Sequence, residues 1–115
     1  MQYALLIYTD EAQDSRMTKQ QGDAISAEYF AFGERYKDKI ASGEALMPTS
    51  SATTVQVREG KTLTTDGPFA ETKEQLGGFY LIHAENLDEA IEIAARIPGA
   101  ATGSVEVRPV MQFNG

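Results

Sequence analysis

Apolar positions dominate the first residues of the chain. Successive side chains of a β-strand point to opposite faces of its sheet. In residues 2–8 both alternating sets are apolar, namely Tyr3, Leu5 and Ile7, then Ala4, Leu6 and Tyr8. A strand of this kind has to be covered on both faces, so residues 2–8 predict a strand inside the assembly. Residues 9–17 are polar and are expected to form a loop.

A helical spacing of apolar residues follows. Thr18 and Gln21 have the spacing of a capping box, and Gly43 stands where a helix-ending glycine is common. The positions between them that share one helical face are Ile25, Tyr29, Phe32, Tyr36 and Ile40. We therefore predict a first helix that begins near Thr18, ends near Gly43 and packs its aromatic stripe into the core.

A hairpin is predicted after this helix. Residues 53–58 and 61–65 are rich in β-branched side chains, and Glu59-Gly60 separates them. A two-residue loop that ends in glycine is typical of a tight β-hairpin. Residues 44–48 are expected to form a short extended segment before it.

The most apolar strand is predicted at residues 79–83. Its alternation places Phe79, Leu81 and His83 on one face and Tyr80 and Ile82 on the other. The preceding pair Gly77-Gly78 allows another backbone to approach closely.

A second helix and a last strand complete the chain. Asn86 and Glu89 form an N-capping pair, and Pro98-Gly99 ends the helix. The stripe expected to face the core is Leu87, Ala90, Ile91, Ala94 and Ile97. Residues 104–111 predict the last strand, which Pro109 places at an edge or a sheet end.

This order of elements predicts one α+β domain over residues 1–115. It is β-α-β-β-α-β with an added hairpin, which indicates a ferredoxin-like antiparallel sheet with two helices on one face. Two helices cover one face only, whereas the strands at 2–8 and 79–83 are apolar on both. We therefore expect a homodimer packed through the sheet face, with a cleft between the sheet and the partner.

Composition narrows the function classes. The chain has 115 residues, no cysteine and a net charge of −7. An acidic surface repels phosphate backbones and anionic lipids, so neither nucleic acid nor membrane is an expected partner. Residues 1–10 read as a strand and not as a signal peptide, and a cytoplasmic location is expected.

One charged segment is the candidate site. Asp66, Glu71, Lys73 and Glu74 fall within nine positions before the strand at 79–83. A buried carboxylate can serve as a general base, so Asp66 is the candidate catalytic residue, and Glu71 and Lys73 are candidate substrate-binding residues. A solvated loop in which Asp66 only caps a turn is the competing interpretation.

Two further residues complete the candidate set. Arg108 shares a strand face with Glu106 and could bind an anion or form a structural ion pair. Tyr80 could donate a phenolic hydrogen bond to a ligand. The pattern assigns no role to His83, and with one histidine and no cysteine neither a metal site nor a cofactor is expected.

Three segments carry a family resemblance. D-G-P-F-A-E-T-K-E-Q-L-G-G-F-Y-L-I at residues 66–82, N-L-D-E-A-I-E-I-A-A-R-I-P at 86–98 and V-E-V-R-P-V at 105–110 resemble the YCII-related family, in its DGPF branch. The resemblance implies a ferredoxin-like domain that forms a dimeric α/β barrel. It also implies bacterial, cytoplasmic proteins, often encoded beside extracytoplasmic-function sigma factors.

Distant members of that family include a dehydrochlorinase that uses a histidine and an aspartate. Its histidine corresponds to residues 23–27, where this chain has D-A-I-S-A, so that chemistry is not carried over.

Three hypotheses of function follow. The first is a dimeric small-molecule-binding protein or lyase/isomerase-type enzyme, with Asp66 as general base and Lys73 or Arg108 holding an anionic substrate. The second is a non-catalytic regulatory module associated with an extracytoplasmic-function sigma factor. The third is a purely structural dimer in which the D-G-P-F turn shapes the rim of the barrel.

Overall fold

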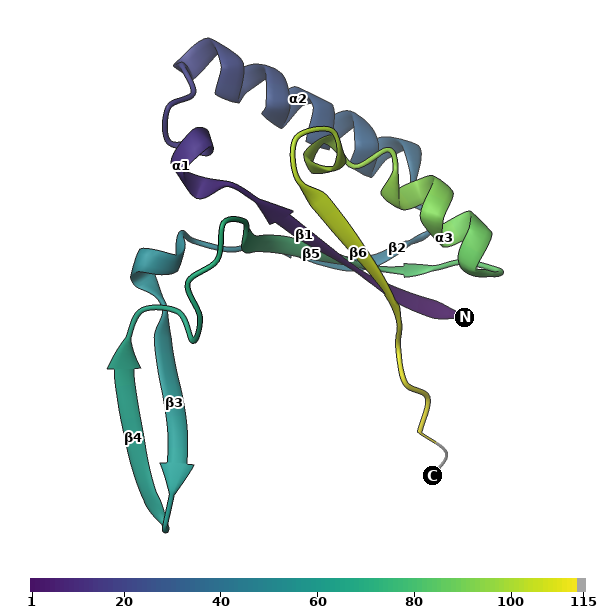
Figure 1. Ribbon diagram of the computed structural model, residues 1–115. Coiled ribbons are helices and arrows are strands. Elements are labelled where there is room, and N and C mark those ends of the chain that lie inside the picture. Colours follow the sequence, from purple (N-terminus) through teal and green to yellow (C-terminus); the bar gives the residue numbers. More distant parts are fainter. Residues whose placement is uncertain (114–115) are drawn as a thin grey trace.

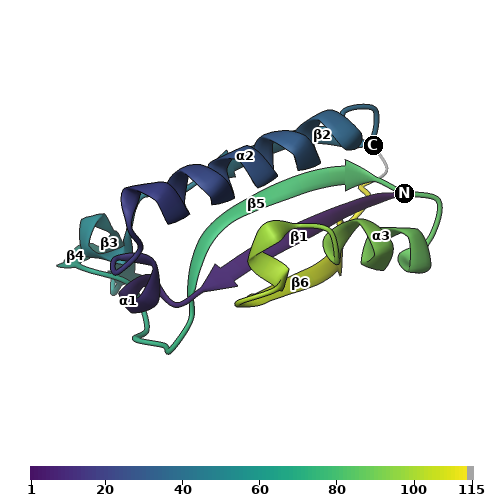
Figure 2. The same ribbon diagram turned by 90° about the horizontal axis from the view of Figure 1, so that it is seen from above.

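The computed structural model describes residues 1–113 and contains a four-stranded antiparallel sheet. The strand order is β2-β5-β1-β6. The strands are β1 (Gln2–Thr9), β2 (Ile40–Ala45), β5 (Gln75–His83) and β6 (Ser104–Pro109). Two helices, α2 (Lys19–Arg35) and α3 (Leu87–Ala94), lie on one face of the sheet (Figure 1). Viewed from above, α2 covers the β2–β5 half and α3 the β1–β6 half (Figure 2). This is the ferredoxin-like arrangement that the sequence predicts.

The core lies between this helical layer and the sheet. Alternation along β1 turns Tyr3, Leu5 and Ile7 toward the helices, where all three are buried. Ile82 of β5 joins them, as its predicted face requires. The helices and the segment after α3 supply Phe32, Ala90, Ile93, Ala94 and Ile97.

The first helix is shorter than the sequence pattern predicts. Its capping box forms as expected, since the Gln21 amide bonds the Thr18 hydroxyl at 3.1 Å. The helix ends at Arg35, however, and not near Gly43. Ile40 continues the apolar stripe but reaches the core from strand β2, where it pairs with Ile82. The prediction was wrong because a residue in the core on the next strand has the same apolar signature as one more helical turn.

The second helix is capped as predicted. The Asn86 side chain accepts a hydrogen bond from the Glu89 amide at 2.9 Å. Of the expected stripe, Leu87 and Ile91 are half exposed, and Ile93 is buried in their place. The helix is followed by a short 3-10 turn, η2 (Pro98–Ala100).

The segment at residues 9–17, which was expected to be a loop, contains a short helix. Helix α1 (Glu11–Asp14) is capped by Asp10, whose carboxylate accepts from the Ala12 amide at 2.9 Å. The Glu11 carboxylate then accepts two hydrogen bonds from Thr49 of the 3-10 turn η1 (Thr49–Ser51). The Thr49 amide donates at 2.8 Å and the Thr49 hydroxyl at 2.7 Å. Together these contacts fix the end of β1 against the segment that follows β2.

The predicted hairpin forms a separate arm. It consists of β3 (Thr53–Arg58) and β4 (Lys61–Asp66), and we call residues 53–66 the arm. Glu59 and Gly60 both have positive φ, 51° and 75°, as a tight hairpin turn requires. The arm extends away from the sheet on the side opposite the helices (Figure 1).

The second face of the sheet carries apolar residues without a helical cover. Ala4, Leu6, Tyr8, Phe79 and Leu81 alternate with the core residues of β1 and β5 and are partly exposed. We call this surface the open face. The homodimer expected through it stays a prediction. In the described residues no helix has both the length and the apolar character to span a bilayer.

Candidate ligand-binding cavity

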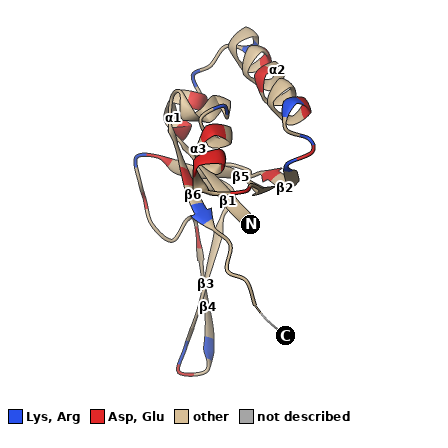
Figure 3. Cartoon of the chain, turned by 90° about the vertical axis from the view of Figure 1, so that its right-hand side faces the viewer, with Lys and Arg blue, Asp and Glu red and all other residues tan. Residues whose placement is uncertain are grey.

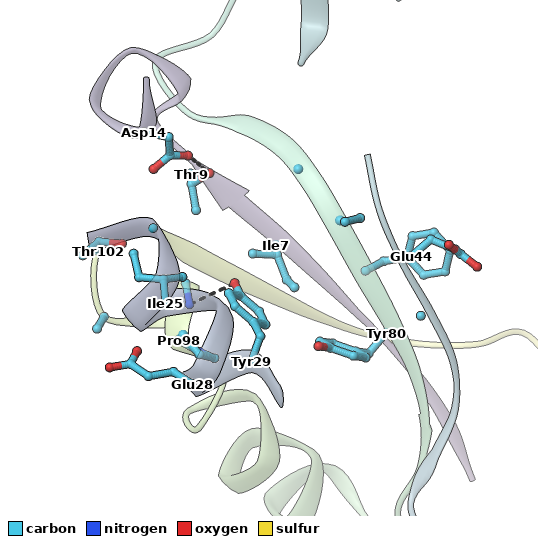
Figure 4. A pocket seen from close by; sticks show the side chains of 18 of the residues that line it. Ile7, Thr9, Asp14, Ile25, Glu28, Tyr29, Glu44, Tyr80, Pro98 and Thr102 are labelled. Carbon is cyan, nitrogen blue, oxygen red and sulfur yellow. Dashed lines mark hydrogen bonds between the residues drawn. The ribbon is translucent and has the colours of Figure 1, made fainter. Parts of the chain in front are cut away.

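A cavity of about 630 Å³ lies between α2 and the sheet. The N-terminal half of α2 diverges from the sheet, and the cavity occupies the resulting space (Figures 1 and 4). Its wall combines residues of α1, α2, the 3-10 turn η2 and strands β1, β2 and β5, among them Ile7, Thr9, Asp14, Ile25, Tyr29, Gly43, Tyr80 and Gly99. Most of this wall is apolar or bare backbone, which suits a partly apolar ligand.

Two glycines allow two tyrosines to occupy this wall. A Cβ at Gly43 would lie 2.6 Å from the Tyr80 ring, so the ring fits against β2 only because residue 43 has no side chain. A Cβ at Gly99 would lie 2.9 Å from both the Tyr29 hydroxyl oxygen and the Ile7 side chain. The glycines therefore set the positions of both phenols.

The two phenols are protonated hydrogen-bond donors at neutral pH. Burial raises the pKa of Tyr29, whereas the bond from the Gly99 amide, at 3.2 Å, opposes that shift. Burial, with a smaller contribution from nearby Tyr29, also raises the pKa of Tyr80. Since the Tyr29 oxygen already accepts a bond from Gly99, its own O–H is left to donate into the cavity.

An exposed carboxylate, that of Asp14, also lines the cavity. Asp14 accepts a hydrogen bond from the Thr9 hydroxyl at 2.8 Å (Figure 4). Burial is the largest cause of the raised pKa of Tyr29, and the negative charge of Asp14 raises it further by a smaller amount. The capped turn of α1 thus holds a proton acceptor within electrostatic reach of a proton donor, in one cavity.

The residues singled out from the sequence lie mostly elsewhere. Of the five, only Tyr80 lines the cavity. Asp66 ends β4 and is exposed, as are Glu71 and Lys73 in the following loop. Arg108 bonds Glu106 along β6, which is the structural pairing that the sequence left open. The assignment of a catalytic role to Asp66 stays a prediction, and Asp66 lines neither this cavity nor the hollow beside it.

Two residues of the cavity were not identified from the sequence. Tyr29 belongs to the stripe interpreted as core packing, and Asp14 lies in the segment interpreted as a loop. The spacing of Asp10 before a short polar helix was the available signal for a fixed Asp14. His83, at the exposed end of β5, lies outside the cavity. Residues 1–113 contain no cluster of three or more His, Asp or Glu that could hold a metal ion.

The fold and cavity define a ferredoxin-like α+β domain with a helix-side pocket. The YCII-related domain model matches residues 1–114, and the chain belongs to that family. An uncharacterized protein of Rhizobium meliloti (strain 1021) is 42% identical over 117 residues, which span 98% of this chain and 94% of the relative.

A solved structure with the same fold is among the matches. It is the 5-chloro-2-hydroxyhydroquinone dehydrochlorinase of Burkholderia phenoliruptrix AC1100, in complex with 2,5-dihydroxybenzoquinone. The TM-score is 0.58 at 17% identity, with 98% of this chain and 96% of that chain covered. At this identity the similarity establishes the fold alone.

Proposed function

We propose that this protein binds a small, uncharged and partly apolar carbonyl or hydroxyl compound in the helix-side cavity and transfers a proton on it, as a lyase/isomerase-type enzyme. The observation that carries the proposal is the placement of Tyr29, Tyr80 and the Asp14 carboxylate on the wall of a single cavity. Donors and an acceptor in one apolar space are the minimum set for enolisation.

The proposed chemistry assigns each group a role. Asp14 removes a proton from the carbon next to a carbonyl, and the electrons of the C–H bond move onto the carbonyl oxygen. The Tyr29 and Tyr80 hydroxyls donate hydrogen bonds to that oxygen as its negative charge develops. Return of a proton to carbon, or loss of a leaving group from the neighbouring carbon, completes an isomerisation or an elimination.

The comparison with the dehydrochlorinase supports this class of ligand. That protein is an enzyme, and its structure holds a six-membered quinoid ring. A cavity of about 630 Å³ has room for a molecule of this size. The base proposed for this chain is its own Asp14, since no histidine lies at residues 23–27.

We also propose that the active species is a cytoplasmic homodimer packed through the open face, from the DGPF branch of the family. Partly exposed Leu6, Phe79 and Leu81 support this assembly. The cavity residues used in the proposal, Asp14, Tyr29 and Tyr80, all belong to one chain. The sigma-factor-associated module stays the alternative prediction, and so does a cleft near Asp66.

The test is hydrogen exchange on 4-hydroxyacetophenone, a neutral ring compound whose methyl group lies next to the carbonyl and therefore has exchangeable protons. Deuterium incorporation into that methyl group, followed by ¹H NMR in D₂O, should be accelerated by the wild-type protein. Asp14→Asn should reduce the exchange rate by at least about 100-fold, the contribution typical of a positioned general base. Tyr80→Phe should weaken both binding and exchange.

Asp23→Asn is the matched control. Asp23 lies on exposed α2, pairs with Lys19 at 2.9 Å and is outside the cavity wall. Its substitution should leave the exchange rate unchanged. Wild-type protein that neither binds the ketone nor exchanges its protons, or an Asp14→Asn variant as active as wild type, contradicts the proposal.

A further inference from the structure

The arm exposes apolar side chains on a hairpin that packs on little of its own chain. Val55 and Val57 are 58% and 59% exposed. They lie on one face of the arm because they are two residues apart on β3, and each pairs with a threonine of β4, Thr64 or Thr62. Every residue of β4 is exposed, and a two-stranded hairpin alone is only marginally stable in water. The arm therefore lacks the packing that would hold it in place.

The dimensions of the chain lead to the same conclusion. The radius of gyration is 16.2 Å, whereas a compact domain of this length has about 13 Å. The chain measures 48 × 47 Å but is only 19 Å thick. β3 and β4 pack on each other and on no other element to a comparable extent. An elongated, flat protomer with a free arm is the form expected of a subunit and not of a stable monomer.

The other unpartnered apolar surface lies on the same side of the molecule. The arm extends from the side of the sheet opposite the helices, where the open face also lies (Figure 1). The segment after β6, which carries exposed Met111 and Phe113, descends on that side as well. The arm, the open face and the segment after β6 thus expose apolar side chains on the same side of the sheet, and the helices cover the opposite side.

Charge at the tip of the arm also favours a second copy. Arg58 and Lys61 face each other across the strand pair, and like charges in this position destabilise an isolated hairpin. Figure 3 shows blue on both strands of the arm near its tip and red in the turn, where Glu59 lies, so the tip carries two basic residues and one acidic residue. A second copy of a chain with net charge −7 offers the opposite sign to this tip.

We propose that the arm clasps a second copy of this chain, so that its Val55 and Val57 face packs against the open face of the partner's sheet. A two-fold axis then places the partner's arm against the first sheet in the same way, which is the self-complementary geometry of a closed dimer. The inference goes beyond the sheet-to-sheet dimer of the proposed function, because it makes the arm necessary for association.

The test uses the full chain. Sedimentation equilibrium should show wild-type dimers, and Val55→Asp combined with Val57→Asp should raise the dissociation constant at least about tenfold. The matched control is Leu87→Asp combined with Ile91→Asp on α3, since both leucine and isoleucine are 49% exposed but lie on the helical side. The control pair should leave the dissociation constant within about twofold of wild type. Circular dichroism of each variant checks that it is folded.

A second measurement locates the arm. Because the chain has no cysteine, Lys61→Cys provides a single site for a nitroxide spin label. Labelled copies mixed with ¹⁵N-labelled wild-type copies should broaden amide signals of the partner's open face around Leu6 and Leu81. Broadening confined to the helical side overturns the proposal.

The outcomes separate the arm from the other proposals. If the arm variant dimerises as tightly as wild type, the clasp is wrong and a sheet-only dimer stands. A wild-type chain that is monomeric at a concentration on the order of 100 micromolar overturns both assemblies. Failure to exchange the protons of 4-hydroxyacetophenone contradicts the proposed function and leaves the arm unaffected, since the cavity lies within one chain.

Discussion

The amide of Gly99 donates a hydrogen bond to the hydroxyl oxygen of Tyr29 at 3.2 Å, across 70 positions of sequence. The contact joins the 3-10 turn η2, which follows α3, to the middle of helix α2. It is possible only because residue 99 has no side chain, since a Cβ there would meet both the phenol and Ile7. This bond fixes the Tyr29 oxygen at the cavity wall and leaves its O–H to donate to a ligand.

Loss of this bond should cost stability. Tyr29→Phe leaves the amide of buried Gly99 without its partner, and an unsatisfied buried donor costs about 1–3 kcal/mol. Tyr80→Phe is the control, because within residues 1–113 the Tyr80 hydroxyl makes no hydrogen bond, and its substitution should cost less. Urea unfolding at one fixed protein concentration measures both. Equal unfolding midpoints for the two variants contradict this reading of the contact.

A methyl group at Gly43 should be more damaging than one at Gly33. The Cβ of an alanine at residue 43 would lie 2.6 Å from the Tyr80 ring and 3.0 Å from the Phe79 carbonyl oxygen. Overpacking of this kind costs about 1–3 kcal/mol, and it should also displace the Tyr80 phenol and weaken ligand binding. At Gly33, within α2, nothing lies within 4 Å of the added Cβ.

Gly33→Ala should accordingly stabilise the protein by about 0.5–1 kcal/mol, because alanine loses less backbone freedom in a helix. Thermal unfolding of the two variants beside wild type gives both signs in one experiment. A Gly43→Ala variant with the unfolding temperature of wild type contradicts the proposed fit of Tyr80 against β2.

Gly43 shows how far the fold could be predicted from the sequence. Periodicity and turn residues located β1, β5, β6, the hairpin turn at Glu59-Gly60 and the caps at Thr18 and Asn86. Periodicity missed β2, because residues 40–43 were assigned to the helix and residues 44–48 to a short extended segment. It extended α2 to Gly43 because glycine is common both after helices and beside large rings. Only the tertiary position of Tyr80 distinguishes the two uses.

The candidate site was predicted less well than the fold. Tyr80 was identified as a possible donor, but the chain has five tyrosines and their spacing distinguishes none of them. Tyr29 has the same apolar signature as its core neighbour Phe32, which is buried, whereas Tyr29 reaches a cavity. The difference arises from the divergence of α2 from the sheet, and a helical stripe carries no information on the tilt of its helix.

Alkaline titration should distinguish the two cavity phenols. Their raised pKa values mean that Tyr29 and Tyr80 should ionise above the ordinary value of 10.0. Between pH 10 and their folded-state pKa values the unfolded chain loses these protons first, so the free energy of unfolding should fall as pH rises through this range. Subtracting the 295 nm titration curves of Tyr29→Phe and Tyr80→Phe from that of wild type isolates each phenol. A difference curve centred at or below pH 10 contradicts the burial of that phenol.

Ligand charge should determine binding, with anions excluded. The cavity wall contains no Lys, Arg or His, and its charged lining residues are acidic, with the Asp14 carboxylate at the mouth. Burying an anion against apolar groups without a cation costs several kcal/mol. The sequence hypothesis held an anionic substrate with Lys73 or Arg108, and neither residue lines this space.

A pair of ring compounds of similar size measures this preference. 4-Hydroxyacetophenone and 4-hydroxybenzoate differ in that an acetyl group replaces a carboxylate. Titration calorimetry at pH 7 should show the ketone binding at least about tenfold more tightly, which corresponds to about 1.4 kcal/mol. Arg16 is a cation in an adjacent hollow that shares Asp14, Met17, Ile25 and Thr102 with the cavity. Arg16→Gln should leave ketone affinity unchanged. Benzoate that binds more tightly than the ketone, and loses affinity in Arg16→Gln, would show that the ligand site extends into that hollow and that its charge preference is the reverse of the one inferred from the wall.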